Sequence, residues 1–175
     1  MLPEMKLPEG PWLHEPDFAR WRDPETGLQC AIIRSDTTGV LCGYVRVPRG
    51  KLHSKLSKYP ARHKPRFFEF GGVKRKVKNC SYNHGLLKTI EVHGGLTFAG
   101  SIYYRKKFDG YWIGFDCGHA WDFMPGVHEL LCSLKKISNE NILAFERDSV
   151  YRDFAYVKAE ITSLARQVAE INRKF

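Results

Sequence analysis

The sequence predicts an α+β fold, with a mainly antiparallel sheet of five or more strands packed by one long C-terminal helix. Short runs of β-branched and aromatic residues, separated by turn residues such as Asp109-Gly110, indicate the strands. Apolar residues that recur at alternating spacings of four and three near the end of the chain indicate a helix with one apolar stripe. With 175 residues the chain can bury a core, and we expect a single domain over 1–175.

Residues 1–27 are predicted to form an extended N-terminal arm, because they hold five of the nine prolines. A short helix is expected within the arm over 16–22, anchored by Trp12, Phe18 and Trp21. Tryptophans in such a segment are typical packing residues, so the arm is expected to dock on the rest of the chain.

Five strands are expected after the arm, over 28–34, 40–47, 87–92, 96–104 and 111–115. The first two are joined by Asp36-Thr37-Thr38-Gly39, which has the residues of a tight turn. The last two are joined by a segment ending in Asp109-Gly110, a pair that predicts a hairpin. These turns are the reason for expecting antiparallel pairing.

The remaining predicted elements are helical. A short helix is expected around 127–135, and a helix of about 25 residues over 149–175, capped by Asp148 or Ser149. The stripe of the long helix consists of Val157, Ile161, Leu164, Val168, Ile171 and Phe175. We expect this stripe to pack across the sheet; its heptad spacing would also suit helix pairing between subunits of a homo-oligomer.

Composition and charge narrow the class of protein. An apolar content of 43% and a mean hydropathy of −0.40 are typical of a globular chain. No apolar run reaches the roughly 18 residues needed to span a bilayer, and the start of the chain lacks an apolar signal region. The five cysteines show no paired spacing, which favours reduced thiols. We therefore expect a cytoplasmic protein that does not enter membranes.

The positive charge is concentrated in a basic insertion over 49–79. Within 51–78 there are ten Lys or Arg residues and one acid, Glu69, whereas the rest of the chain carries 18 basic and 18 acidic residues. This insertion could be a solvated loop, or an electropositive rim that attracts an anionic ligand through Lys74, Arg75 and Lys76. The alternation Phe68-Glu69-Phe70 could also form a strand.

Two segments concentrate the reactive side chains of the chain. The first is His93-Gly94-Gly95-Leu96-Thr97, and the second runs from Gly114 to Asp122 with the sequence GFDCGHAWD. Both follow predicted strands, a position that favours functional sites. We expect His93, Asp116, His119 and Asp122 to surround one pocket. Such a group could bind a divalent metal ion, transfer protons as an acid–base pair, or form a structural hydrogen-bonded cluster.

Other residues of these segments are candidates for ligand binding. Gly94 and Gly95 suit a turn with positive φ and could let a ligand approach backbone N–H groups. Thr97 offers a hydroxyl donor, and Tyr104 and Trp112 could form an aromatic wall for a base. Cys117 could be a nucleophile, but strand alternation places it opposite Asp116, and we expect it in the core.

The motifs VHGGLT, at residues 92–97, and GFDCGHAWD resemble a family of small uncharacterised proteins encoded by phages and prophages. Further stretches similar to that family are CGYVRVP at 42–48 and YRDFAYV at 151–157. The resemblance implies a setting in the host cytoplasm, where small phage proteins counter immune signalling by nucleotides.

Two functions follow from this reasoning. The protein could hydrolyse a phosphoester of a nucleotide-like signal molecule, with His93 and His119 as base and acid and the two aspartates orienting them. Alternatively, it could bind such a molecule and sequester it unchanged. Direct nucleic-acid binding is less favoured, because the sequence contains no helix-turn-helix, zinc-finger or RNP pattern.

Overall fold

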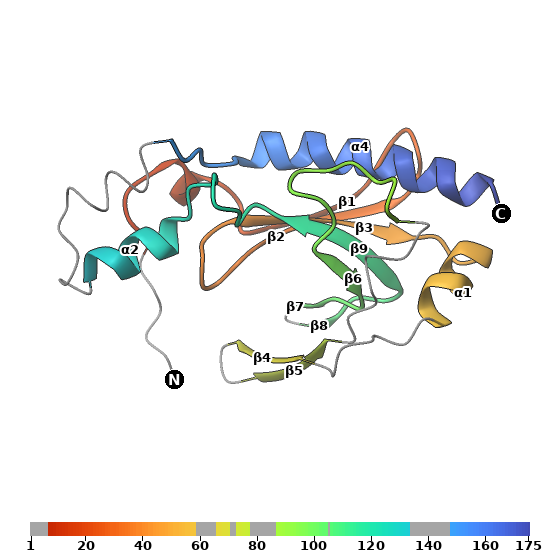
Figure 1. Ribbon diagram of the computed structural model, residues 1–175, viewed down its shortest axis with the longest axis horizontal. Coiled ribbons are helices and arrows are strands. Elements are labelled where there is room, and N and C mark those ends of the chain that lie inside the picture. The colour runs from red at the N-terminus through yellow and green to blue at the C-terminus, as the bar shows by residue number, and fades with distance from the viewer. Residues whose placement is uncertain (1–6, 59–65, 71–72, 78–86, 105, 134–147) are drawn as a thin grey trace.

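A five-stranded antiparallel sheet with one long helix on its face forms the centre of the molecule (Figure 1). The structure, a computed structural model, describes residues 7–58, 66–70, 73–77, 87–104, 106–133 and 148–175. The strand order is β1-β2-β3-β9-β6, and the C-terminal helix α4 (Phe154–Arg173) lies along the sheet. The predicted α+β class is therefore confirmed.

The first three strands form a meander. They are β1 (Phe18–Arg22), β2 (Gln29–Arg34) and β3 (Leu41–Val47). The predicted helix over 16–22 is wrong, because this segment is the edge strand β1, which pairs with β2 along its whole length. In the sequence Phe-Ala-Arg-Trp-Arg, successive side chains point to opposite faces, so Trp21 faces the main core and the two arginines face away from it. This two-residue alternation of side chains is typical of a strand and not of a helix.

The other side of the sheet is built by β9 (Tyr111–Asp116) and β6 (Phe98–Gly100). β9 pairs with β3 from Val47↔Tyr111 to Cys42↔Asp116. In the sequence, β6 and β9 are separated by β7 (Tyr103–Tyr104) and β8 (Lys106–Lys107), which form a small two-stranded sheet of their own. The predicted strands at 28–34, 40–47 and 111–115 match strands of the sheet, whereas β6 is much shorter than the strand expected over 96–104.

The strand predicted over 87–92 is wrong. This segment begins with a turn at 87–89 and continues as irregular backbone. The backbone groups of Glu91 bond to α4 rather than to a neighbouring strand, because the Gln167 side chain accepts from Glu91 N–H at 2.8 Å and donates to Glu91 C=O at 2.8 Å. Leu87 and Ile90 meanwhile reach into the core. This short apolar run thus lies beside α4 and does not join the sheet.

Helix α4 begins later than the sequence suggested, since its N-cap is Asp153 rather than Asp148 or Ser149. Oδ1 of Asp153 accepts the backbone N–H of Tyr156 at 2.7 Å. The predicted stripe is buried at Val157, Ile161, Leu164 and Val168, and Ile171 and Phe175 pack at its margin. The sheet of the same chain therefore covers the face that could have paired helices between subunits.

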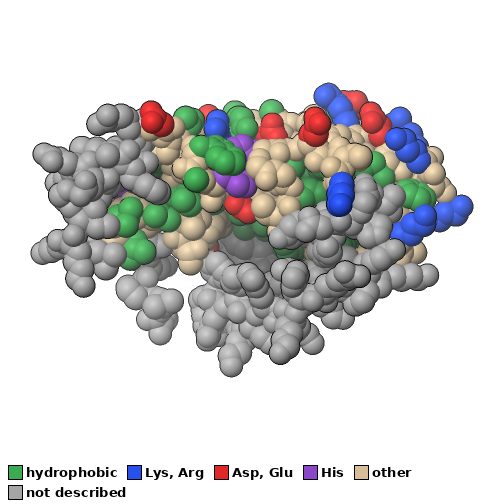
Figure 2. Space-filling view, in the orientation of Figure 1, with side chains coloured by type: hydrophobic (Ala, Val, Ile, Leu, Met, Phe, Trp, Pro, Cys, Tyr) green, Lys and Arg blue, Asp and Glu red, His purple; other side chains and the backbone are tan. Residues whose placement is uncertain are grey.

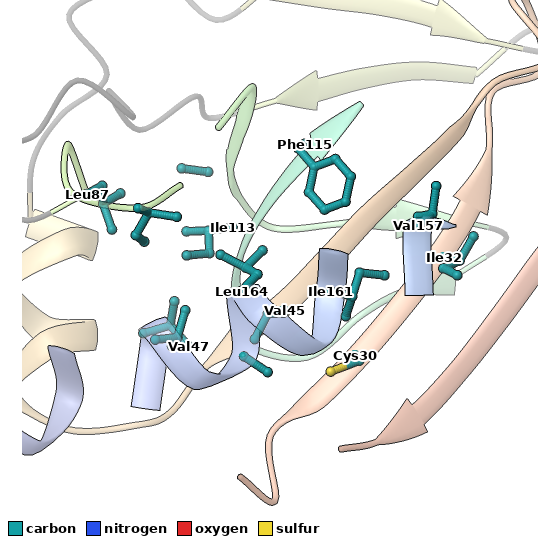
Figure 3. Packing of buried hydrophobic residues seen from close by; sticks show 14 of the residues in the cluster. Cys30, Ile32, Val45, Val47, Leu87, Ile113, Phe115, Val157, Ile161 and Leu164 are labelled. Carbon is teal, nitrogen blue, oxygen red and sulfur yellow. The ribbon is translucent and has the colours of Figure 1, made fainter. Parts of the chain in front are cut away.

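Close approach of α4 to the sheet depends on Gly43 in β3. A Cβ at this position would lie 2.8 Å from Cγ1 of Ile161 and 2.6 Å from Cζ of Phe115. Figure 3 shows the same region of the core, with Ile161 and Leu164 of α4 among Val45, Ile113 and Phe115 of the sheet. The face away from α4 is covered in part, because Trp112 and Ala31 form a second cluster there with Phe108 and Ile102.

The N-terminal arm is joined to the sheet through a buried arginine. After the short 3-10 helix η1 (Pro11–His14), the arm supplies Glu15 and Asp17 as partners of Arg34, at 3.2 and 2.6 Å. Arg34 also donates to the hydroxyl of Tyr151, at 2.8 Å, and Tyr151 lies just before α4. One guanidinium group therefore ties the arm, β2 and the start of α4 together.

The predicted basic insertion contains regular structure. Helix α1 (Lys51–Lys58) buries Leu52 and Leu56, and a hairpin of β4 (Arg66–Phe70) and β5 (Val73–Val77) follows. The side chains of Lys74, Arg75 and Lys76 in β5 lie outside the described part, as does that of Tyr104. Helix α2 (Pro125–Ser133) corresponds to the helix expected around 127–135. Residues 134 and 135 lie outside the described part of the chain. Among the described residues, no helix is long and apolar enough to cross a membrane.

Candidate functional site

The candidate site is built on a β-turn from His119 to Asp122, directly after β9. Asp122 N–H donates to the carbonyl of His119 at 2.9 Å, which closes the turn. In return, Oδ2 of Asp122 accepts the backbone N–H of His119 at 3.1 Å and lies 3.2 Å from Nδ1 of its imidazole. His119 and Asp122 are therefore brought together by a turn.

His93 reaches this turn from the other motif. Its Nε2 lies 2.8 Å from Oδ2 of Asp122, and the His93 and His119 rings are 5.2 Å apart between centroids. The backbone of His93 is held from α4, because Oε2 of Glu160 accepts its N–H at 2.8 Å. The bond from His93 to Asp122 therefore joins the two motifs, and α4 holds the backbone of the first motif in place.

Asp122 is the common acceptor of the cluster. Its side chain is completely buried, and its Oδ1 accepts a hydrogen bond from Nε of Arg152 at 3.0 Å. Burial alone would raise the pKa of the Asp122 carboxyl. Hydrogen bonds from His93, from the His119 backbone and from Arg152 more than offset burial, so its pKa lies below the usual value. Asp122 is therefore an anion at neutral pH.

The hydrogen-bond network assigns the protons of His93. An ionised Asp122 can only accept, so Nε2 of His93 carries the proton of that bond. Nδ1 of His93 lies 3.0 Å from the hydroxyl of Tyr156. Burial, followed by the negative charge of Glu160, raises the pKa of the Tyr156 phenol, so the phenol keeps its proton and donates it to Nδ1 when the imidazole is neutral. Both nitrogens of His93 are thus engaged, and its side chain is only 5% exposed.

His119 differs from His93 in exposure and in its second nitrogen. With Nδ1 donating to Asp122, Nε2 is the nitrogen that keeps a lone pair. No hydrogen bond to Nε2 is found among the described residues. The side chain of His119 is 18% exposed, against 5% for His93, so His119 is the more accessible of the two imidazoles. Figure 2 shows histidine side chains at the surface beside the start of α4, bordered by hydrophobic and basic side chains.

The surroundings of His119 fix its orientation. Gly94 has a φ of 62°, which favours glycine, and a Cβ there would overlap the imidazole of His119. On the other side Trp121, which is 52% exposed, stacks on the imidazole with ring centroids 5.1 Å apart and planes 8° from parallel. The first glycine of the GG pair is thus required by the site itself.

The cluster could also hold a metal ion. One ligand atom from each of His93, His119 and Asp122 can be chosen so that all lie within 4.8 Å of one another, and imidazole nitrogen with carboxylate oxygen suits a divalent ion. However, Arg152 already neutralises Asp122, and its positive charge would oppose a cation bound to the same carboxylate. Arg152 therefore disfavours a metal ion at this carboxylate, whereas proton transfer and a structural hydrogen-bonded cluster are both compatible with these contacts.

Asp116 does not join the cluster, although the sequence placed it there. In the ladder it lies opposite Cys42, on the sheet face away from α4, because successive residues of β9 alternate between the faces. Its Oδ1 accepts the backbone N–H of Gly118 at 3.0 Å. Burial, followed by the charge of Asp116, raises the pKa of the Cys42 thiol to about 12. Asp116 thus shapes the turn after β9.

Some of the predicted ligand-binding residues lie at the site and others do not. Of these, Gly94 touches His119, whereas the neighbouring Gly95 donates its N–H to the carbonyl of Val92. Thr97 continues the ladder through a bond from its N–H to the carbonyl of Gly114, at 3.0 Å. Trp112 is fully buried on the face away from α4, so it cannot form a wall for a ligand. The aromatic surface of the site is Trp121 instead.

Cys117 is a core residue, as alternation along the strand indicated. It is 2% exposed and packs on the α4 side of the sheet. Burial, followed by the negative charge of Asp122, raises the pKa of its thiol far above the ordinary value. A thiol in this state is not a nucleophile, because the thiolate is the reactive form.

Sequence reasoning missed four residues of the site: Trp121, Arg152, Tyr156 and Glu160. Arg152, Tyr156 and Glu160 recur at intervals of four, which places Tyr156 and Glu160 on one face of α4 directly after Arg152. That polar row borders the apolar stripe, and it was the available signal. Trp121 lies between His119 and Asp122 in the sequence, and its exposure could not be foreseen.

Comparison with models of known protein families, with curated proteins and with solved structures found no match.

Proposed function

We propose that the cluster of His93, His119 and Asp122 is an acid–base site that hydrolyses a phosphoester in a nucleotide-like ligand. The observation that carries the proposal is the shared carboxylate. One ionised aspartate contacts two imidazoles, and His119 is the more exposed of the two, with no hydrogen bond to its Nε2 among the described residues. An imidazole held this way by a carboxylate is a general base, because the carboxylate stabilises the imidazolium that forms.

The roles of the two histidines differ from an interchangeable base and acid. His119 accepts the proton of the attacking water through Nε2 as the water oxygen bonds to phosphorus. The bond from phosphorus to the ester oxygen breaks, and that oxygen takes its proton from solvent. His93 is buried, and both of its nitrogens are hydrogen-bonded, one to Tyr156 of α4 and the other to Asp122. Because Tyr156 holds the His93 ring in place, the ring in turn holds the Asp122 carboxylate in place. In this arrangement Asp122 orients the base, and Asp116 has no part in the reaction.

The ligand class is suggested by the groups beside His119. Trp121 presents an exposed aromatic surface, on which a nucleobase could stack at a gain of about 1–3 kcal/mol. Arg152 is 24% exposed and stands 5.0 Å from the Tyr156 ring, so a guanidinium group is available close to the carboxylate. A stacking surface and a cation beside one base suit a nucleotide-like anion. The resemblance to phage proteins adds that such a ligand would be a host defence signal.

Sequestration is the second candidate function. The specific observation in its favour is that stacking on Trp121 already covers one face of the His119 ring. A ligand stacked on the outer face of Trp121 would be held by the indole and by Arg152 without reaching Nε2. In that case the histidines would hold the turn in place and would perform no chemistry.

One experiment separates the two functions. The protein is incubated with a panel of cyclic and ADP-ribose-type nucleotides, and each mixture is analysed by chromatography before and after heat denaturation. Consumption of a nucleotide with appearance of a product supports hydrolysis. Recovery of the intact nucleotide only after denaturation supports sequestration. A panel in which nothing is consumed or retained contradicts both functions. The Trp121→Ala variant serves as the control for stacking and should weaken capture in either case.

A further inference from the structure

Two arginines and the glutamine between them form a row across three strands, on the sheet face away from α4. Arg22 of β1 pairs with Gln29 of β2. The adjoining pair Cys30↔Val45 places Gln29 level with Arg46 of β3. Residues directly opposite one another on neighbouring strands carry their side chains on the same face, so Arg22, Gln29 and Arg46 stand side by side. Like charges in such a row repel each other unless an anion lies between them.

These side chains line an open groove. Its volume is about 450 Å³, and its lining adds Arg49 and Asp109 to the three residues of the row. This volume is in the range of small-molecule sites. Oε1 of Gln29 accepts a bond from Arg20 at 2.6 Å, which leaves its amide NH₂ group as the donor that it contributes. Every polar side chain of the lining except Asp109 therefore offers N–H donors.

Asp109 neutralises only part of this charge. Its Oδ2 lies 2.8 Å from Arg46 and 3.4 Å from Arg49, so one carboxylate serves two guanidinium groups. Arg22 donates to the carbonyl of Gly27 at 2.7 Å and has no carboxylate partner among the described residues. Asp109 is 71% exposed, so its side chain can turn to solvent when another anion enters. Three guanidinium groups and one displaceable carboxylate leave the groove with an excess of positive charge.

We propose that this groove is a binding site for the phosphate groups of a small anionic ligand. Guanidinium groups match phosphate oxygens with paired N–H donors, and a concave site of this size fits a pyrophosphate or phosphomonoester group better than a long flat chain. The site is separate from the acid–base cluster. The cluster lies beyond the end of β9, where Asp116 pairs with Cys42 of β3. Arg46 lies four residues along β3 from Cys42, which is about 13 Å in a strand, and its side chain is on the sheet face away from α4. The proposal therefore does not depend on the proposed hydrolysis.

The probe for this site is inorganic pyrophosphate, with binding measured by isothermal titration calorimetry at low salt. Wild type should bind. Arg46→Gln should weaken binding about tenfold, since a charged hydrogen bond and its charge are both lost. Arg49→Gln should weaken it roughly threefold, and it keeps the fold because Arg49 is 78% exposed. Asp109→Asn should strengthen binding roughly threefold, because it removes the competing carboxylate.

Two controls keep the result specific to the groove. Arg166→Gln makes the same charge change at an exposed arginine of α4, which is paired with Glu25, and this variant should bind as wild type does. His119→Ala should also bind as wild type, whatever its effect on turnover, which separates this site from the acid–base cluster. Equal affinities for wild type, Arg46→Gln and Arg49→Gln would overturn the proposal. So would an oligonucleotide that binds the groove and is not displaced by pyrophosphate.

Discussion

Nε2 of His93 donates to Oδ2 of Asp122 across 2.8 Å, and this bond joins two segments that lie 29 positions apart in the sequence. Neither residue is exposed, so the bond forms in a region of low dielectric, where a hydrogen bond to an ionised group is strong. The same carboxylate oxygen also orients His119. The geometry of the accessible imidazole therefore depends on a buried contact that no ligand touches.

Replacement of the shared acceptor should destabilise the fold. In Asp122→Asn one oxygen becomes an NH₂ group facing donors, and Arg152 loses its buried counter-charge, so we expect a loss of about 3 kcal/mol in the free energy of unfolding. Urea denaturation measures it. Asp116→Asn is the matched control, since that carboxylate lies on the other sheet face and accepts from Gly118; its effect should stay below about 1 kcal/mol. Equal losses in the two variants would contradict the central position of Asp122.

The stability of the protein should also fall in acid through Asp122. The folded-state pKa of this carboxyl is below its unfolded value, so the unfolded chain takes up the proton first as the pH drops. The contribution is fully present above the ordinary pKa of an aspartate, near 4, and is lost as the pH falls through the lower folded value. Urea denaturation between pH 7 and pH 3 should show a steeper decline for wild type than for Asp122→Asn. Parallel curves would indicate that another group controls the acid transition.

The apolar stripe of α4 provides a test of the architecture. Leu164→Asp places a charge in a position with no exposure, and we expect a loss of more than about 4 kcal/mol or complete unfolding. Ala159→Asp is the control, because Ala159 is exposed on the same helix and should tolerate the charge. Circular dichroism melting curves compare the two. If Leu164→Asp melts at the wild-type temperature, α4 does not pack on the sheet as described.

Cys117 should be dispensable for chemistry. Cys117→Ala removes one buried sulfur, so a loss of stability of about 1 kcal/mol is expected, with turnover at the wild-type level. In wild type, iodoacetamide at pH 8 should label the exposed Cys132 and leave Cys117 and Cys30 unmodified in the folded state. Peptide mass spectrometry reads the labelling. Rapid labelling of Cys117 would be inconsistent with a buried, protonated thiol.

Much of the fold could be predicted from period and turn chemistry. The strands β2, β3 and β9 combine β-branched or aromatic residues with clear turn signals, and α4 has a regular apolar stripe that only a helix explains. The segment 87–92 has the same kind of apolar run, but its backbone bonds to Gln167, and no local signal distinguishes a strand partner from a helix side chain. The edge strand β1 was missed because prolines on either side of it suggested a helix start.

Only the part of the candidate site that is local in the sequence could be predicted. His119 and Asp122 are three residues apart in a turn, so their proximity follows from the sequence. Membership of His93 required knowledge of the path of 87–93 along α4. Arg152 and Tyr156 reach the site because a parallel bridge between Asp122 and Val150 fixes the start of the C-terminal segment there. Contacts of this kind depend on tertiary structure, which a pattern of residues does not encode locally.

If Nε2 of His119 is the base of a hydrolytic site, as proposed, the turnover of His119→Ala must fall. With the nucleotide that the panel identifies, the rate is measured at saturating concentration for wild type, His119→Ala and Asp116→Asn. A general base contributes about 10²- to 10⁴-fold to the rate, so His119→Ala should lose at least that lower factor while Asp116→Asn keeps the wild-type rate. Equal rates for wild type and His119→Ala would contradict the account.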